Sequence, residues 1–164
     1  MCYDRCMRQK LEPCKDGGVN MAKRKLFRWI LALCWLALTV FLSQQSGSQS
    51  AAVSGWFTKA VTRLFGLFGI NASYAALHYI MRKLAHFCVH FILAILIYRA
   101  FIITNEYQKN AILLTLFTCM VVAFFDEGIQ SVAPGRAMMV GDLILNLFGV
   151  TSGTIAGILT VKQK

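Results

Sequence analysis

Residues 26–42 read LFRWILALCWLALTVFL, and Arg28 is the only charged side chain in this run. A helix that crosses a bilayer needs about 20 predominantly apolar residues, with a lower limit of about 17, so this run is just long enough to span a membrane. Three further apolar runs follow it, at 84–103, 111–125 and 143–161. We therefore predict four transmembrane helices.

The composition of the whole chain agrees with this prediction. Of its 164 residues, 57% are hydrophobic and 15% are charged, whereas a soluble domain is typically about 45–50% apolar and about 25% charged. A soluble domain of this length could not bury so much apolar surface, because small domains leave a large share of their surface exposed. The composition excludes an ordinary soluble enzyme, a coiled coil and a disordered chain. The predicted fold class is an all-α polytopic membrane protein with one compact domain.

The segment 56–70, between the first and second runs, has a different pattern. Lys59 and Arg63 are four residues apart and therefore share one face of a helix. Apolar side chains tend toward the other face: Trp56, Ala60, Leu64, Leu67 and Phe68. Helices with this pattern lie in the membrane interface rather than crossing it. We expect one interfacial amphipathic helix, which is either a linker packed on the bundle or a lid over a lipid headgroup or substrate.

Residues 1–20 are polar and contain no apolar run, which is not the pattern of a signal peptide. Residues 15–20, KDGGVN, lie directly before Met21 and have the composition that a purine-rich ribosome-binding site would encode if it were translated. We therefore expect Met21 to be the native start. The expected organisation is a polar N-terminal tail over 1–20 and a transmembrane domain over 21–164.

The net charge of +10 is distributed in short basic clusters beside the apolar runs. These clusters are Lys23, Arg24, Lys25 and Arg28; Arg82 and Lys83; and Lys162 and Lys164. Such a distribution is typical of residues that orient helices in a bilayer, so we expect no nucleic-acid partner. The positive-inside rule predicts a multi-pass protein of the cell membrane with both termini in the cytoplasm and a loop over 126–142 outside. Arg82 and Lys83 run against this orientation.

With this topology, polar side chains from three spans fall at one level near the outer surface. Lys83 would lie at the surface, with His86 about one turn and His90 about two turns below it on the same helix face. The others at this level are Asp126, Glu127 and Gln130 at the end of the third span, Arg136 in the loop, and Asp142 and Asn146 at the start of the fourth span. Ionisable groups near hydrocarbon are costly, so they should face inward and pair. Lys83 and Arg136 would neutralise two of the three carboxylates.

Two interpretations of this polar layer stay open: an ion-pair network that only fixes the helices, and a site that binds or converts a polar headgroup. For a reaction, the catalytic candidates are Glu127 or Asp126 as general base and His86 as acid or base. The binding candidates are Lys83, Gln130, Arg136, Asp142 and Asn146, with Arg136 suited to hold a phosphate or carboxylate. His86, His90, Asp126, Glu127 and Asp142 could supply metal ligands, but side chains on different spans have no diagnostic spacing. We therefore assign no metal and no other cofactor.

Gly149, Gly153 and Gly157 follow one another at intervals of four on the fourth span. Small residues at this spacing let a neighbouring helix approach closely. They predict tight packing either within the monomer or between copies, so a homo-oligomer through these glycines is one expected form of association.

Three groups of motifs in this chain are informative in combination. They are FLSQ at 41–44 followed by Ser46 and Gly47, RKLAHF at 82–87, and DEGIQ at 126–130 followed by Pro134, Gly135, Arg136, Asp142, Asn146 and Gly149. In this combination the chain, from about residue 25 to its end, resembles the VanZ-like family of bacterial membrane proteins. It departs from the family pattern at Val89, His90 and Ile129, where a glutamate, an aromatic residue and a histidine are common. The resemblance implies a multi-pass membrane protein and, for the founding member, a contribution to resistance against the glycopeptide teicoplanin.

Two classes of function follow from these observations. In the first, the protein contributes to teicoplanin-type resistance by binding or modifying a cell-envelope component at the outer face, and its partner is a membrane lipid or a lipid-linked component. In the alternative, it is a membrane-embedded hydrolase or transferase that acts on a lipid-linked substrate. A transporter is less favoured, because one small bundle shows no inverted repeat.

Overall fold

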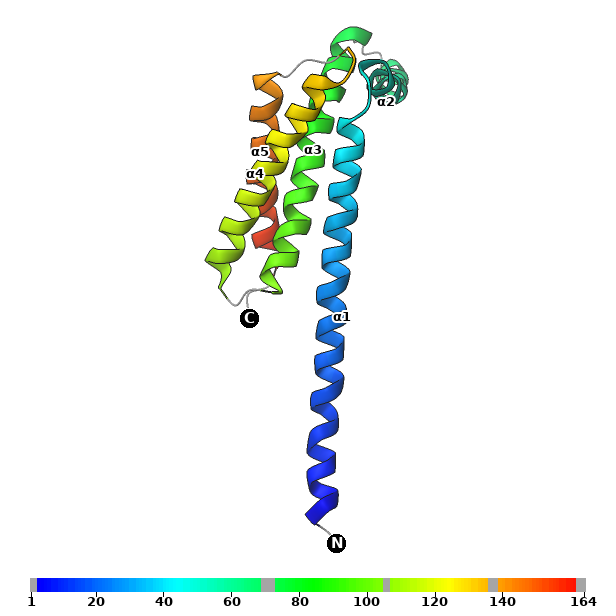
Figure 1. The fold of residues 1–164 in the computed structure, drawn as a ribbon. Coiled ribbons are helices and arrows are strands. Elements are labelled where there is room, and N and C mark those ends of the chain that lie inside the picture. The colour runs from blue at the N-terminus through cyan, green and yellow to red at the C-terminus, as the bar shows by residue number, and fades with distance from the viewer. Residues whose placement is uncertain (1–2, 69–72, 105–106, 136–138, 162–164) are drawn as a thin grey trace.

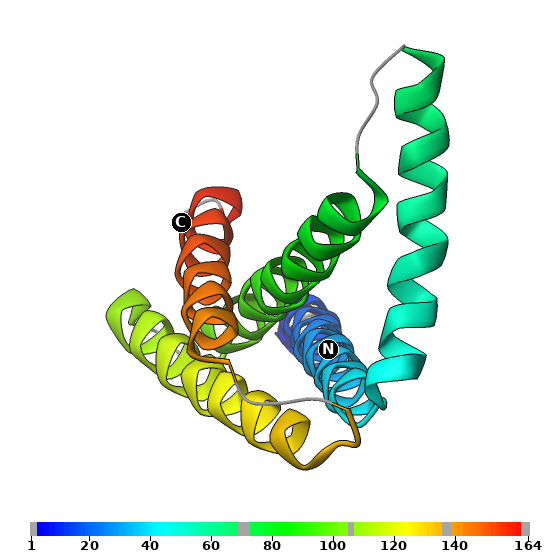
Figure 2. The same cartoon turned by 90° about the horizontal axis from the view of Figure 1, so that it is seen from above.

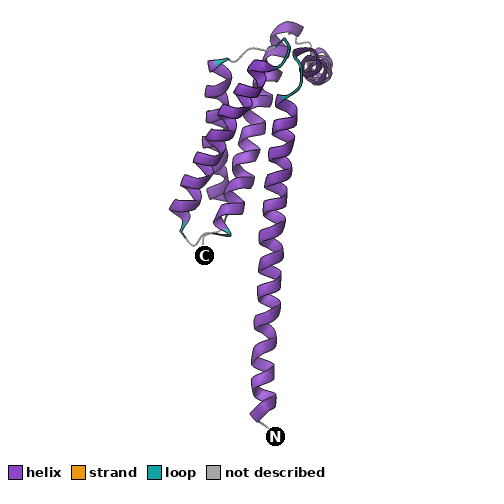
Figure 3. Cartoon of the chain, viewed as in Figure 1, coloured by secondary structure: helices purple, strands orange, loops and turns teal. Residues whose placement is uncertain are grey.

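The computed structural model describes residues 3–68, 73–104, 107–135 and 139–161, and the regular structure in these segments is entirely helical (Figure 3). There are five helices in this part of the chain: α1 (Tyr3–Ser43), α2 (Gly47–Leu67), α3 (Tyr74–Ile102), α4 (Gln108–Val132) and α5 (Val140–Thr160). Four segments are long and apolar enough to cross a membrane, namely Val19–Ser43, Tyr74–Ile102, Gln108–Val132 and Val140–Thr160. The predicted all-α polytopic fold is confirmed.

The four spans run side by side, whereas α2 lies across one end of them. Figure 1 shows α1, α3, α4 and α5 lengthwise and α2 end-on. Seen along the bundle in Figure 2, α2 lies outside it, beside the ends of α1 and α3. This is the arrangement expected of a helix that lies along a membrane surface. We call this end of the molecule the α2 end.

Large apolar side chains are exposed on every one of these helices. They include Phe41 on α1, Trp56 and Leu67 on α2, Tyr79 on α3, Phe117 and Phe125 on α4, and Phe148 and Leu159 on α5. A water-soluble monomer rarely exposes a continuous apolar surface of this kind. The exposed surface is therefore the one that faces lipid in a multi-pass membrane protein.

Three helix boundaries differ from those predicted. The helix α2 begins at Gly47 rather than near residue 56, because Ser46 and Gln49 form a capping box in which each side chain accepts a hydrogen bond from the other residue's backbone N–H. The helix α3 begins at Tyr74 rather than near residue 84, because the charged residues Arg82 and Lys83 lie within the helix and do not end it. The helix α4 continues to Val132, so the prediction of a loop starting at residue 126 is wrong.

At its other end, α1 begins at Tyr3, so the polar N-terminal segment and the first span share one helix. The start of the native protein at Met21 stays a prediction. Arg28, the charged residue of the quoted run, is partly buried and donates from its guanidinium to the backbone oxygen of Arg99 at 3.1 Å. This contact satisfies a cation that would be costly in hydrocarbon.

The helix α3 is central and packs against each of the other four. Its closest neighbour is α5, where Gly149, Gly153 and Gly157 face α3: a Cβ atom added at Gly149 would lie 2.6 Å from the backbone oxygen of Phe87, and one at Gly157 would lie 2.8 Å from the Tyr98 ring. The glycine stripe therefore packs within the monomer. Association of copies stays a prediction.

Candidate functional site

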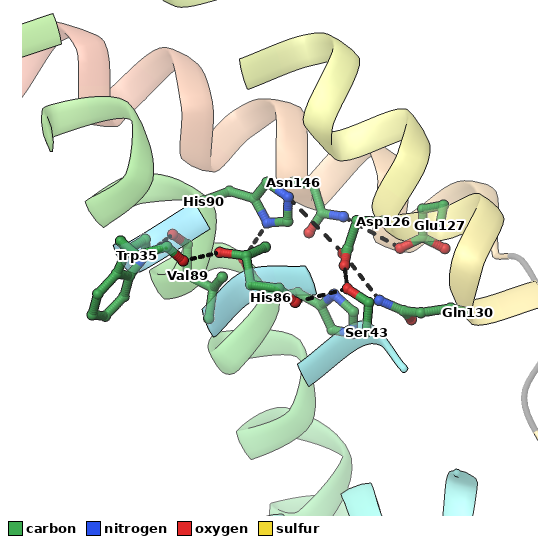
Figure 4. A network of polar contacts seen from close by, with 10 residues as sticks. Trp35, Ser43, His86, Val89, His90, Asp126, Glu127, Gln130 and Asn146 are labelled. Atoms are coloured by element: carbon green, nitrogen blue, oxygen red, sulfur yellow. Dashed lines mark hydrogen bonds and ion pairs between the residues drawn. The ribbon is translucent and has the colours of Figure 1, made fainter. Parts of the chain in front are cut away.

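The interior of the bundle changes from apolar to polar toward the α2 end. Away from that end, the buried core consists of small and aliphatic residues: Ala32, Leu93, Ala94, Ile97, Ala100, Cys119 and Val150. Toward the α2 end, most of the buried side chains are polar: Ser43, His90, Asp126, Glu127, Gln130, Asp142 and Asn146. Figure 4 shows most of them as one network between four helices. Of the predicted site residues, Arg136 lies outside the described segments.

Asp126 on α4 is the hub of this network. The Ser43 hydroxyl of α1 donates a hydrogen bond to Asp126 Oδ1, and Gln130 Nε2 donates to Oδ2 at 3.0 Å. Gln130 reaches Asp126 because residues four apart are neighbours on a helix face. His90 Nε2 of α3 lies 3.9 Å from Asp126 Oδ2. Side chains from α1, α3 and α4 thus meet at this carboxylate.

The neighbouring carboxylate, Glu127, is fully buried and points toward α5. Asn146 Nδ2 donates to Glu127 Oε1 at 3.2 Å, and Asn146 is itself fully buried. Asn146 Oδ1 has no hydrogen-bond partner among the described residues. Because Asp126 and Glu127 are consecutive on α4, they connect α1 and α3 on one side with α5 on the other.

Lys83 and Asp142 form a separate ion pair between α3 and α5. The Asp142 side chain is 5% exposed and the Lys83 side chain is 20% exposed. The Lys83 ammonium also lies 5.1 Å from the centroid of the Tyr79 ring. The prediction that Lys83 neutralises one carboxylate is confirmed, and the same prediction for Arg136 falls outside the described residues.

Two of the histidines of α3, His86 and His90, point to different neighbours. His90 is 1% exposed, and its Nδ1 lies 3.2 Å from the backbone oxygen of His86. His86 is partly buried and lines the pocket described below. Lys83 lies about two and a half turns inside α3, rather than at its start as predicted, because the helix begins at Tyr74.

His86, Asp126 and Glu127 each offer one ligand atom to a common point, and these atoms lie within 4.8 Å of one another. Asp142, a fourth residue considered as a ligand from the sequence, pairs with Lys83 instead. The sequence spacing of these residues does not predict a metal site, because they come together only when α3 and α4 pack against each other.

A pocket of about 400 Å³ opens between α1, α2 and α3. Its wall is mainly apolar and includes Leu42, Val53, Phe57, Leu84 and Val89, while His86, His90, Asp126 and Gln130 supply polar atoms. A second pocket of about 280 Å³ lies between α1 and α4, and it shares Thr39, Ser43 and Asp126 with the first. Asp126 is therefore in contact with both pockets.

Ser43 and Thr39 were not among the predicted site residues. Both are buried, and Ser43 donates to Asp126 as well as to the backbone oxygen of Thr39. In the sequence, only the position of Ser43 pointed to a role in the site: it lies at the polar end of an apolar run, within the FLSQ motif.

Comparison with known proteins identifies the family. The family model described as VanZ/LLP1 matches residues 27–161. The chain belongs to the VanZ/LLP1 family. No curated protein and no solved structure matches it. The matched range contains the whole network around Asp126, so every side chain of the site lies in the part of the chain that defines this VanZ-family member.

Proposed function

We propose that this VanZ-family protein takes up an amphipathic component of the cell envelope, a lipid or a lipid-linked polymer precursor, in the pocket between α1, α2 and α3. By binding or modifying this component at the outer face of the cell membrane, it lowers the access of glycopeptides of the teicoplanin type to their target. The observation that carries this proposal is the pocket of about 400 Å³, with an apolar wall and a group of buried polar side chains at one side.

The pocket has the size and the lining of a ligand site. Small-molecule sites typically enclose about 300–1,000 Å³ and combine apolar walls with a few convergent polar groups. Here Val53, Phe57 and Leu84 suit an acyl or isoprenoid chain, and His86 and Gln130 can contact a polar headgroup.

The helix α2 supplies one wall of the pocket and also an apolar surface. Trp56 is 68% exposed and Leu67 is 83% exposed, whereas Gly55 and Thr58 are buried. Exposed Lys59 and Arg63 are suited to anionic headgroups. A helix with these properties can lie at the membrane surface and bound a pocket that opens toward lipid.

The orientation rests on charge. The basic cluster before the first span favours a cytoplasmic N-terminus, which puts the α2 end outside. In a variant without the native cysteines, a single cysteine at Ser48 should react with a membrane-impermeant maleimide in intact cells, and one at Asn110 should not. The reverse labelling pattern would contradict the orientation.

Lipids that copurify with the protein test the proposed binding. Val53→Trp fills the pocket from α2, whereas Ala52→Trp adds the same side chain at an exposed neighbouring position outside the pocket lining. Mass spectrometry of protein in native membrane nanodiscs should show one class of lipid or lipid-linked component enriched with the wild type and with Ala52→Trp, and lost with Val53→Trp. Equal lipid profiles for all three proteins would contradict the pocket as a binding site.

A second candidate, a membrane-embedded hydrolase or transferase, is favoured by the proximity of His86, Asp126 and Glu127. In that case Glu127 or Asp126 acts as general base and His86 as acid or base. Purified wild type should then convert a component of a labelled lipid extract, and Glu127→Gln should not. Equal turnover by the two proteins would exclude catalysis by Glu127.

The link to resistance is tested in the native host. Deletion of the gene should lower the concentration of teicoplanin that inhibits growth, and the wild-type gene should restore it. Unchanged susceptibility would remove the resistance role and leave the binding proposal to be decided by the lipid profiles.

A further inference from the structure

We propose that His86, Asp126 and Glu127 bind a divalent metal ion, with zinc as the preferred ion and His90 Nε2 as the fourth protein ligand. The site lies between α3 and α4, and two of its ligands, His86 and Asp126, line the pocket of about 400 Å³. The inference does not depend on the proposed function, since metal binding can be measured without any lipid or antibiotic.

The spacing of the ligand atoms is close to that of a metal site. Zinc binds imidazole nitrogen and carboxylate oxygen at about 2.0–2.2 Å in a tetrahedral arrangement, so two ligand atoms on one ion lie about 3.3–3.6 Å apart. The atoms offered by His86, Asp126 and Glu127 lie within 4.8 Å of one another. The longest separation can therefore exceed the tetrahedral value by about 1 Å, and rotation of the side chains of His86, Asp126 and Glu127 can close this gap.

His90 gives an independent indication of a cation at this point. Its Nδ1 lies 3.2 Å from the backbone oxygen of His86, which can only accept a hydrogen bond, so Nδ1 carries the proton. In the neutral ring, Nε2 then presents a lone pair. This nitrogen is buried, has no hydrogen-bond partner within the described segments, and lies 3.9 Å from Asp126 Oδ2.

A lone pair that faces a carboxylate oxygen is repelled by it, and a cation between the two atoms turns this repulsion into attraction. The separation of 3.9 Å is too long for a hydrogen bond, but it suits two ligands of one metal ion. The competing arrangement is a protonated His90 that forms an ion pair with Asp126 without any metal. The two arrangements differ in metal content, so they can be distinguished directly.

The carboxylates are also oriented as metal ligands usually are. Ser43 and Gln130 donate to Asp126, and Asn146 donates to Glu127. Such outer hydrogen bonds fix the direction of ligating carboxylates. Because Asp126 and Glu127 are held from α1, α4 and α5, their positions do not depend on the ion.

The donor set selects the class of metal. One or two imidazole nitrogens with two carboxylate oxygens suit zinc and other transition metals, whereas Mg²⁺ and Ca²⁺ prefer oxygen ligands alone. Since His86 and Asp126 line the pocket, the ion has a route from outside to the site.

The test uses the full chain, purified in nanodiscs with an affinity tag that contains no histidine. After equilibration with Zn²⁺ or Co²⁺ and removal of the excess, metal analysis should find about one ion per chain in the wild type. Glu127→Gln and His86→Gln should lower the apparent affinity for Co²⁺ tenfold or more. His78→Gln is the matched control, because His78 is the remaining histidine of the chain, also lies on α3, and lines no part of this cluster.

The wild type provides a measurement that does not rely on variants. X-ray absorption of the zinc-loaded protein should show a first coordination shell of nitrogen and oxygen with imidazole scattering and no sulfur. A wild type that retains no metal would overturn the proposal and support the protonated His90. So would a sulfur shell, or equal Co²⁺ affinity in wild type, Glu127→Gln and His86→Gln. Failure of this test leaves the lipid profiles of Val53→Trp and Ala52→Trp unaffected, so the two proposals can fail separately.

Discussion

The two halves of the contact between α3 and α5 are built in different ways. One stripe of α5 carries Asp142 and Asn146 in its first turns and Gly149, Gly153 and Gly157 in those that follow. In the glycine half, the helices approach until backbone and side chain touch. In the polar half, the Lys83–Asp142 ion pair joins α3 and α5, and a hydrogen bond from Asn146 to Glu127 joins α5 to α4. Close packing fixes the fold in one half, and hydrogen bonds hold a site in the other.

The largest effect is expected in the glycine half. A Cβ atom at Gly153 would collide with the backbone oxygen of Phe91 and lie 3.0 Å from Ala94 Cβ. Overpacking typically costs about 1–3 kcal/mol, and here the obstacle is backbone, so Gly153→Val should lower the free energy of unfolding by about 3 kcal/mol or more. Thermal unfolding in detergent measures this.

Gly128→Ala is the matched control for Gly153→Val, since a Cβ at Gly128 meets nothing within 4 Å. It should leave the protein as stable or make it more stable by about 0.5–1 kcal/mol, because alanine is the better helix former. If both variants unfold at the wild-type temperature, close helix packing is not what fixes this half.

A smaller effect is expected when the ion pair of the polar half is broken. Lys83→Met leaves the buried Asp142 without its cation, and removal of one partner of a buried pair costs about 3–5 kcal/mol. Because Lys83 is partly exposed, we expect a loss near 2–3 kcal/mol in thermal unfolding. The double variant Lys83→Met with Asp142→Leu should recover most of it, and a double variant as unstable as Lys83→Met would show that Asp142 has another role in packing.

Two buried polar residues of α5, Asn146 in the polar half and Thr154 in the glycine half, test the difference between the halves. Asn146→Leu removes the donor to buried Glu127 and should cost about 1–3 kcal/mol. Thr154 is also buried, but in the described part of the chain its hydroxyl donates only to the Val150 oxygen of its own helix. Thr154→Val should therefore cost no more than about 1 kcal/mol. Equal losses in thermal unfolding would mean that the polar half is not a cooperative network.

The smallest effect is expected outside this contact, between α1 and α3, where Trp35 Nε1 donates to the backbone oxygen of Val89 at 3.0 Å. Trp35→Phe keeps an aromatic ring and removes this hydrogen bond, which is worth about 0.5–1.5 kcal/mol. Unfolding of the variant in parallel with wild type measures the difference. A loss above about 3 kcal/mol would indicate that ring volume, rather than the hydrogen bond, matters here.

The spans and the level of the polar residues could be predicted from the sequence. Apolar runs of about 20 residues must cross a bilayer, and successive crossings return polar ends to the same side. This reasoning placed His86, Asp126, Glu127 and Asn146 at one height before any pairing was known. It also predicted that Lys83 neutralises one of the three carboxylates, and the structure shows that this carboxylate is Asp142.

The pairings and the helix ends required the structure. Whether His90 turns toward Asp126 or toward lipid depends on the rotation of α3, which the packing of α5 glycines against Phe87 and Phe91 determines. The end of α4 was misplaced because Asp126, Glu127 and Gln130 look like loop residues in sequence. They remain helical because partners on α1, α4 and α5 satisfy them inside the bundle.

One contact at the α2 end links the amphipathic helix to the helix that bears the carboxylates. The backbone N–H of Gly47, the first residue of α2, donates to the oxygen of Pro134 just beyond α4 at 3.0 Å, and Gly135 next to it has a φ of 73°, which favours glycine. The N-terminus of α2 is thus attached at two points: to α1 through the chain and to the end of α4 through this hydrogen bond. A force on α2 in the plane of the membrane, such as the lateral pressure of the lipids, therefore acts on the end of α4 as well as on α1.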